Sequence, residues 1–163
     1  MRMSTRGRYA LRAMVDLALH ADEGPVLRRD IVARQEMSAD YVAQLFRRLR
    51  AAGLVKGVKG PGGGYKLARD AVTIRAGDVV RAVEGPIAAV HCAIPSGERS
   101  CDRVDGCVTH LLWKELSEAI AEFLDAVTLQ DLCDRAYQLS RGEGWGNSQS
   151  DSVSLDRRGA SRR

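Results

Sequence analysis

Residues 28–67 combine a short helical segment, a turn, a longer basic helical segment and a glycine-rich hairpin pattern, and this order restricts the fold more than any other feature. Residues 28–35 place Ile31 and Val32 on one side of a two-turn helix. Ser38 is suited to cap a second helix and Gly53 to end it. The apolar positions of that helix recur every three or four residues: Val42, Leu45, Phe46, Leu49 and Ala52. The pattern predicts a helix-turn-helix.

A β-hairpin is predicted directly after this motif. Two β-prone runs, 54–59 and 65–67, flank a turn with the sequence Gly-Pro-Gly-Gly-Gly. The turn has neither the spacing of a P-loop nor that of a dinucleotide-binding loop, which argues against a nucleotide site. A hairpin in this position makes a winged helix, and we interpret its tip as a contact to a phosphate backbone, flanked by Lys56, Lys59 and Lys66. A tight turn with incidental lysines is the alternative.

The rest of the chain is predicted to be mainly helical. Apolar spacing indicates helices over 8–20 and 73–84, a long helix from Val108 and a last helix that a Thr128–Asp131 capping box opens. We therefore expect a mainly α protein with a small β-hairpin wing and a long C-terminal dimerisation helix. Its parts are a winged helix-turn-helix domain (1–84), a metal-binding loop (85–107), a dimerisation helix with a terminal helix (108–140) and a disordered tail (141–163).

Charge divides the chain into a basic and an acidic half. Residues 1–70 contain 14 Lys and Arg against 7 Asp and Glu, whereas residues 71–140 contain 6 against 11. Clustered cations favour binding to phosphates, so double-stranded DNA is the expected partner, and a solvated arginine-rich surface is the alternative. No apolar run approaches the ~18 residues of a membrane helix, and the arginine-rich start lacks the form of a secretory signal. We expect a cytoplasmic protein with no membrane partner.

Candidate DNA contacts lie on the second helix of the motif and on the hairpin. The amide of Gln44 can pair with an adenine edge, and the arginines and lysines can contact phosphates or a groove. The complete set is Ser38, Asp40, Tyr41, Gln44, Arg47, Arg48, Arg50, Lys56, Lys59, Gly60 and Gly62. For the arginines, a charged and solvated helix face is the alternative.

Three cysteines and a histidine follow the spacing C-x8-C-x5-C-x2-H, as Cys92, Cys101, Cys107 and His110. Thiolates and imidazole suit both iron–sulfur clusters and zinc, and disulfides are rare in a reducing cytosol. We expect a metal centre, with incidental thiols as the alternative. A Cys107–His110 nucleophile–base pair lacks a recognisable third group, so we do not expect an enzyme. Cys133 lies in an apolar helical pattern, which indicates a packed thiol.

The long C-terminal helix carries an apolar stripe that steps by three and four residues: Trp113, Leu116, Ile120, Phe123 and Val127. Such a seam is typical of helices that associate. We expect part of it to bury against a second copy of the chain, which gives a twofold homodimer. A purely intramolecular core is the alternative.

Five segments fall in register with one known family: Ser-Thr-Arg-Gly-Arg-Tyr-Ala (4–10), Gln-Leu-Phe-Arg-Arg-Leu (44–49), Val-Lys-Gly-Pro-Gly-Gly-Gly-Tyr (58–65), Gly-Asp-Val (77–79) and Thr-His-Leu-Leu-Trp (109–113). They resemble the IscR-type family of iron–sulfur-sensing bacterial transcription regulators. The resemblance implies a winged-helix homodimer whose DNA binding a [2Fe–2S] cluster controls. The implied ligands are Cys92, Cys101, Cys107 and His110, and zinc in the same site is the alternative. RNA polymerase and iron–sulfur assembly proteins are candidate further partners.

The sequence departs from the family pattern at three places. The gap between Cys92 and Cys101 is longer than is typical of the family. Lys59 stands in the wing where the family often has arginine, and a lysine is a point charge rather than a planar fork. The second helix carries Asp40 and Ala43 where related regulators often have other polar residues, so the DNA sequence that is recognised stays open.

Overall fold

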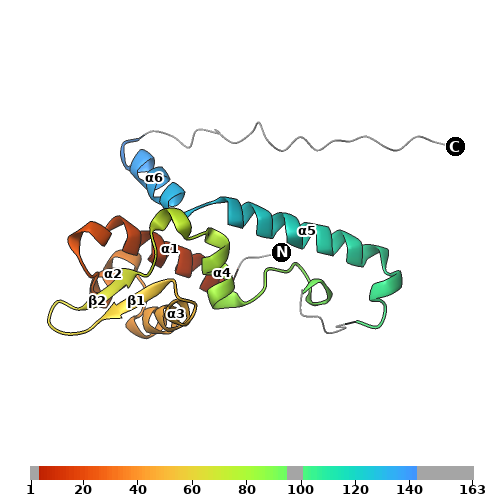
Figure 1. The fold of residues 1–163 in the computed structure, drawn as a ribbon, viewed down its shortest axis with the longest axis horizontal. Coiled ribbons are helices and arrows are strands. Elements are labelled where there is room, and N and C mark those ends of the chain that lie inside the picture. Colours follow the sequence, from red (N-terminus) through yellow and green to blue (C-terminus); the bar gives the residue numbers. More distant parts are fainter. Residues whose placement is uncertain (1–3, 95–100, 143–163) are drawn as a thin grey trace.

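The computed structural model describes residues 4–94 and 101–142 (Figure 1). Its helices and strands are α1 (Thr5–Leu19), α2 (Arg28–Gln35), α3 (Ala39–Ala51), β1 (Val55–Val58), β2 (Gly64–Leu67), α4 (Ala76–Glu84), α5 (Val108–Ala126) and α6 (Leu129–Ser140). Four short 3-10 turns are η1 (Ala21–Glu23), η2 (Ala71–Thr73), η3 (His91–Ala93) and η4 (Val104–Gly106). Helices α1–α4 and the hairpin gather into one body, from which α5 projects. The mainly α fold with a winged helix-turn-helix is confirmed. The predicted tail beyond residue 142 lies outside the described residues.

Helices α2 and α3 form the predicted helix-turn-helix. Helix α2 ends at Glu36, which adopts a left-handed conformation with φ 54°. The hydroxyl of Ser38 then accepts a hydrogen bond from the backbone N–H of Tyr41 at 3.2 Å, which is the predicted N-cap of α3.

None of the helices within 4–94 and 101–142 has the length and apolar character that crossing a membrane requires.

The hydrophobic core lies between α1, α2, α3, α4 and the base of the hairpin. Its largest fully buried side chains include Phe46, Met14, Leu17, Ile31 and Leu45. The rings of Phe46 and Tyr65 lie 4.2 Å apart between centroids, so the hairpin packs directly on α3. The apolar positions that recur at helical spacing in the sequence supply this core.

The hairpin pairs β1 with β2 in an antiparallel register in which Val55 faces Leu67 and Val58 faces Gly64. The backbone of Val26 extends this pairing, because Val26 and Tyr65 exchange two N–H···O=C bonds of 2.9 and 2.8 Å. The segment that leads into α2 is thereby fixed to the wing. The wing and the helix-turn-helix consequently form one unit.

A buried ion pair joins α1 to α2. Asp16, which is only 3% exposed, accepts two hydrogen bonds of 2.8 Å from Arg34 and one of 3.0 Å from Gln35. The hydrogen bond to Asp16 raises the pKa of Arg34 further above its ordinary value. Bidentate pairs of this kind are directional, so this contact fixes the orientation of α2 on α1.

Helix α4 begins at Ala76 rather than at the predicted residue 73. Residues 71–73 form the turn η2 instead, and the chain then runs extended alongside the segment that leaves α5. The backbone N–H of Ala76 donates to Val127, and that of Leu129 donates to Ile74, at 2.9 and 2.8 Å. This pairing also ends α5 at Ala126 and leaves Val127 buried beyond the helix. Local periodicity does not reveal such a backbone pairing between distant segments.

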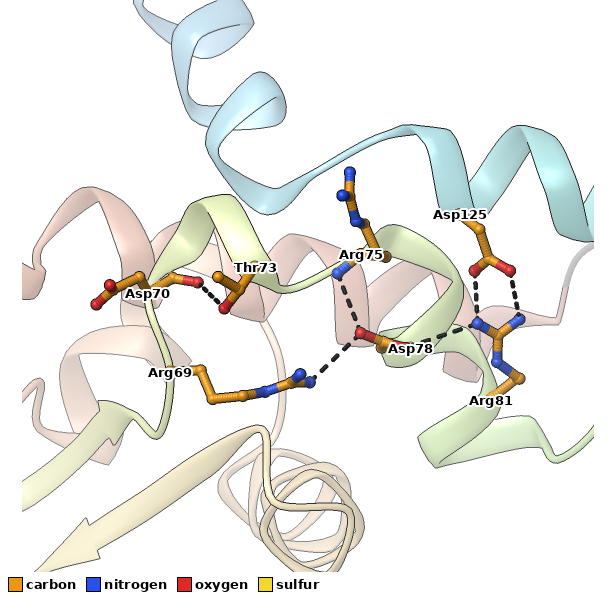
Figure 2. Close-up of polar contacts among 7 residues, drawn as sticks. All are labelled: Arg69, Asp70, Thr73, Arg75, Asp78, Arg81 and Asp125. Carbon is orange, nitrogen blue, oxygen red and sulfur yellow. Dashed lines mark hydrogen bonds and ion pairs between the residues drawn. The ribbon is translucent and has the colours of Figure 1, made fainter.

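A network of ion pairs connects the exit of the wing to α4 and α5 (Figure 2). Arg69, which follows β2, donates to Asp78 of α4 at 3.3 Å. Arg81, one turn further along α4, forms a two-pronged contact with Asp125 of α5. The hydrogen bond to Asp125 raises the pKa of Arg81 above its ordinary value. Ion pairs therefore connect α4 to the exit of the wing on one side and to α5 on the other.

Candidate nucleic-acid interface and metal site

The exposed face of α3 presents several of the predicted DNA contacts. Asp40, Gln44 and Arg47 are all exposed and are spaced by four and three residues, which places them on one side of the helix. Tyr41 is half-buried, because its ring packs edge-on against Tyr9 of α1 at 5.9 Å. The Ser38 hydroxyl is occupied by the helix cap. Helix α3 therefore offers a polar outer face over an apolar inner one.

The wing tip carries the two predicted glycines in conformations that favour glycine. Gly60 has φ 101° and Gly62 has φ 73°. The backbone N–H of Gly63 donates to Gly60 at 2.9 Å and closes the turn. Lys56 on β1 and Lys59 directly after β1 are exposed, and Lys66 pairs with Lys56 from β2. The tip is thus a narrow turn with cations on both flanks.

A basic groove of about 580 Å³ runs between α2, α3 and the wing. Four cations line it: Arg28, Arg29, Arg50 and Lys59. Arg50 and Lys59 are among the DNA contacts predicted from the sequence, whereas Arg28 and Arg29 are not. Their position in the sequence could have indicated a binding role, because two arginines in the first turn of a helix are unfavourable next to the positive end of the helix dipole. A bound phosphate would offset that cost, because both the cations and the helix N-terminus attract it.

Arg48 makes a contact within its own chain. Its guanidinium donates to the backbone oxygen of Val83, in the last turn of α4, at 3.0 Å. Arg6 of α1 donates to the same oxygen at 3.3 Å. Carbonyls at the end of a helix lack partners in the helix itself, so these arginines cap α4. Arg48 thus connects α3 to the segment that precedes the cysteine loop.

Cys107 and His110 lie together at the start of α5. The Cys107 sulfur lies 3.1 Å from the Thr109 hydroxyl. Hydrogen bonds from this hydroxyl and from the backbone N–H of His110 lower the pKa of the Cys107 thiol. The Nδ1 atom of His110 is buried and has no hydrogen-bond partner among the described residues. A thiol of lowered pKa, one helical turn from an unsatisfied imidazole nitrogen, has the chemistry of a metal site.

The other two predicted ligands are not gathered around this pair. Cys92 is half-buried in η3 and Cys101 is exposed. Within 4–94 and 101–142, no three His, Cys, Asp or Glu side chains lie close enough together to hold a metal ion. The donor types fit a metal or an iron–sulfur cluster, whereas the described geometry does not gather three of these donors at one point. Cys92 and Cys101 flank residues 95–100, which lie outside the described part.

Ser117, which was not among the residues predicted from the sequence, connects α5 to the loop that follows α4. Its hydroxyl accepts a hydrogen bond of 2.9 Å from the backbone N–H of Ala89 and donates one of 2.6 Å to the Trp113 carbonyl. Ser117 is the one buried residue of α5. A serine within a helical pattern gives no sequence signal for such a contact, because its partner lies 28 positions away.

The predicted association stripe is largely exposed. Phe123 is 62% exposed, Trp113 and Leu116 are each 37% exposed, and Ile120 is half-buried. Val127 differs, because it is only 5% exposed and packs within its own chain. Leu111 and Leu112 add further exposed apolar surface near the start of α5. The described chain therefore leaves an apolar face of α5 uncovered.

Cys133 packs within the fold, as predicted. It is 4% exposed on α6, and burial raises the pKa of its thiol to about 11. A thiol with this pKa is protonated at neutral pH. It is therefore a poor nucleophile and a poor metal ligand.

Comparison with known proteins places this geometry among bacterial regulators. The Rrf2 family model, described as an iron-dependent transcriptional regulator, matches residues 3–135. The HTH-type transcriptional regulator IscR of Yersinia enterocolitica is 48% identical over 132 residues, which cover 81% of this chain and 79% of the relative. That of Pectobacterium atrosepticum is 48% identical over 140 residues, covering 86% and 84%.

Solved structures agree with the sequence comparison. The structure of T. potens IscR is similar with a TM-score of 0.68 at 39% identity, covering 83% of this chain and 88% of that one. The structure of CymR, the global cysteine regulator of B. subtilis, is similar with a TM-score of 0.67 at 38% identity, covering 83% and 98%. The fold is therefore shared with proteins of different named roles.

Proposed function

This chain belongs to the Rrf2 family of transcriptional regulators, and we propose that a [2Fe–2S] cluster on Cys92, Cys101, Cys107 and His110 controls its DNA binding. The observation that carries the metal part is the buried, unpartnered Nδ1 atom of His110 one turn from a Cys107 thiol of lowered pKa. A buried nitrogen without a hydrogen-bond partner is costly unless a ligand satisfies it. Membership of a regulator family also argues against an enzymatic role.

The DNA-binding surface consists of the outer face of α3, the basic groove and the wing tip. Gln44 and Arg47 project from α3 at positions suited to base edges, whereas Arg28, Arg29 and Lys59 lie around the groove and suit phosphates. Because phosphate contacts fix orientation, the groove would set how deeply α3 enters the major groove of DNA.

A homodimer follows from the uncovered apolar face of α5. Phe123, Trp113 and Leu116 would leave a large apolar stripe in water on a single chain. A second copy of α5 would bury it and arrange two winged helices about a twofold axis. The pair would then recognise two inverted half-sites.

The proposed cluster would be held by donors on both sides of residues 95–100. Cys107 and His110 come from α5, and Cys92 and Cys101 from the loop segments that must close on them. When bound, the cluster supplies a redox-active centre, and histidine ligation raises its reduction potential above that of an all-cysteine site. Cys107 would contribute a thiol whose pKa is lowered, and His110 would contribute its buried, unpartnered Nδ1 atom.

A direct contact supports control of DNA binding by this site. The segment that carries Cys92 starts from the end of α4, and the last turn of α4 is capped by Arg48 of the DNA-binding helix. A change in the loop would therefore act on a helix end that Arg48 holds. We infer that a change in the loop at the cluster site alters the position of α3 relative to DNA. Cluster binding and DNA binding would then each change the affinity of the other.

Anaerobic purification with visible absorption and counts of iron and sulfide tests the metal centre. We expect a coloured protein with two irons per chain, and the colour should be lost in Cys92→Ala, Cys101→Ala and Cys107→Ala. Cys133→Ala is the matched control and should keep the colour, because Cys133 is a packed thiol. One zinc without iron or sulfide would instead support the zinc alternative.

The DNA-binding surface is tested by charge removal at the groove. Arg28→Ala should weaken binding to duplex DNA, whereas Lys114→Ala on α5 should not, because Lys114 is paired with Glu118 and lies outside the groove. Equal binding by both variants and the unchanged protein would remove α2 from the interface.

A further inference from the structure

Ser117 is unusual on α5 because every other residue of this helix is exposed or half-buried. Its hydroxyl proton is used within the helix, on the carbonyl of Trp113 at 2.6 Å. An oxygen lone pair is thereby free to receive the Ala89 N–H at 2.9 Å. The hydroxyl thus links α5 to the loop that follows α4.

The two ends of this hydrogen bond lie close in sequence to proposed ligands. Ser117 follows His110 by seven residues, which is two helical turns, so both side chains lie on the same face of α5. Ala89 precedes Cys92 by three residues. The bond therefore ties the segment that leads to Cys92 to the helix face that carries His110.

We propose that Ser117 is a positioning residue for the metal centre, which it serves by fixing the Cys92 segment against the His110 face of α5. This inference rests on the proposed cluster site. Ser117 does not itself donate to the metal, because its oxygen is occupied by Ala89 and its proton by Trp113. It acts through the loop, by reducing the conformational freedom that Cys92 loses when a cluster is bound.

The distance between α5 and the loop that follows α4 also depends on the hydrogen bond from Ala89 to Ser117. Helix α5 packs against the turn η3, and the Ser117 hydroxyl bonds the loop just before that turn. Without the hydroxyl, the Ala89 N–H would lose its partner in a half-buried position. The loop would then be free to move away from α5 and to expose Cys92.

Ser117→Ala and Ser117→Thr in the full chain test this role. Threonine retains the hydroxyl, whereas alanine removes it and keeps a helix-compatible side chain. We expect the cluster absorption of Ser117→Ala to decay about 10–100-fold faster than that of the unchanged protein on exposure to a chelator. Ser117→Thr should restore most of the lifetime.

Ser140→Ala is the matched control. The Ser140 hydroxyl donates to the Tyr137 carbonyl within α6 at 2.8 Å, much as Ser117 does within α5. It lies on a different helix from the ligands, so its removal should leave the lifetime unchanged. Amide hydrogen exchange at Ala89 in cluster-free protein gives a second readout, and we expect faster exchange in Ser117→Ala only.

Each outcome decides for or against the proposal. A cluster lifetime in Ser117→Ala equal to that of the unchanged protein overturns it, as does an equal loss in Ser117→Ala and Ser117→Thr. If the unchanged protein holds zinc, the same comparison is made on the rate of zinc loss, and the cluster proposal alone fails. If the unchanged protein binds neither metal, both proposals fail.

Discussion

Gly77 lies against the carboxylate of Asp125 so closely that a Cβ atom at position 77 would overlap Oδ1 of Asp125. Gly77 is in the first turn of α4, and Asp125 is near the end of α5. The missing side chain lets the Asp125 carboxylate reach Arg81 (Figure 2). The approach of α5 to the winged helix thus depends on a glycine in a helix, where glycine is otherwise unfavourable.

Gly77→Ala is expected to destabilise the protein despite the higher helix propensity of alanine. Propensity alone would stabilise α4 by roughly 0.5–1 kcal/mol, but the overlap with Asp125 should cost about 1–3 kcal/mol as an overpacked site. Denaturant unfolding measures the balance. Gly106→Ala is the control, because nothing lies near that position. A Gly77→Ala protein that is more stable than the unchanged one would contradict the packing argument.

Arg48→Ala and Lys59→Ala are both expected to weaken DNA binding, but only Lys59→Ala should change its salt dependence. Lys59 faces the groove, so its removal should reduce the slope of log K against log salt by about one phosphate contact. Arg48 is bonded to Val83, so its removal should lower stability by about 1 kcal/mol and leave the slope unchanged. Titrations at several salt concentrations separate the two. An equal change in slope would place both side chains on phosphates.

Stability should fall with rising pH above about 9 because of Cys133. The folded protein keeps this thiol protonated up to a pKa of about 11, whereas the ordinary value in the unfolded chain is 9.0. Between these values the unfolded state binds fewer protons, so its relative free energy falls as pH rises. Below pH 9 the contribution is complete. Cys133→Ala should flatten the alkaline part of the stability curve, and an unchanged curve would show that the thiol is accessible.

Phe123→Glu is expected to convert the proposed dimer to a monomer at micromolar concentration. A carboxylate in the middle of the α5 stripe would have to be desolvated on association. Val72→Glu is a matched control, because Val72 is similarly exposed but lies on η2. Sedimentation velocity distinguishes the species. A monomeric unchanged protein with its metal centre intact would refute the dimer.

Local patterns in the sequence predict much of the fold. The bounds of α2, the Ser38 cap and the Thr128–Asp131 capping box each depend on residues a few positions apart, and the structure confirms them. The glycine-rich turn and its flanking β-prone runs likewise predict the hairpin. In these places, backbone preference and apolar spacing favour the same structure.

Features that depend on distant contacts were not predictable in this way. The apolar spacing that includes Val127 continues past the point where α5 ends, since the pairing of Val127 with Ala76 ends that helix. The contact of Arg48 with Val83 likewise spans 35 positions, so local spacing does not reveal it. At the proposed metal site, spacing identifies the candidate donor types, but it does not reveal that no three of the described donors lie close enough together to hold a metal ion.

The largest fully buried side chains come from α1–α4, the hairpin, the start of α6 and the connecting residues Leu54 and Ile74, and α5 contributes none. The winged helix therefore owes little of its own stability to the helix that carries Cys107 and His110. Substitutions on the exposed face of α5 can change the proposed ligands, the loop contacts or the proposed subunit contact without removing a fully buried side chain from that core. Such a division lets one DNA-binding scaffold acquire different sensing chemistries by stepwise mutation, because each step is spared the cost of unfolding the part that binds DNA.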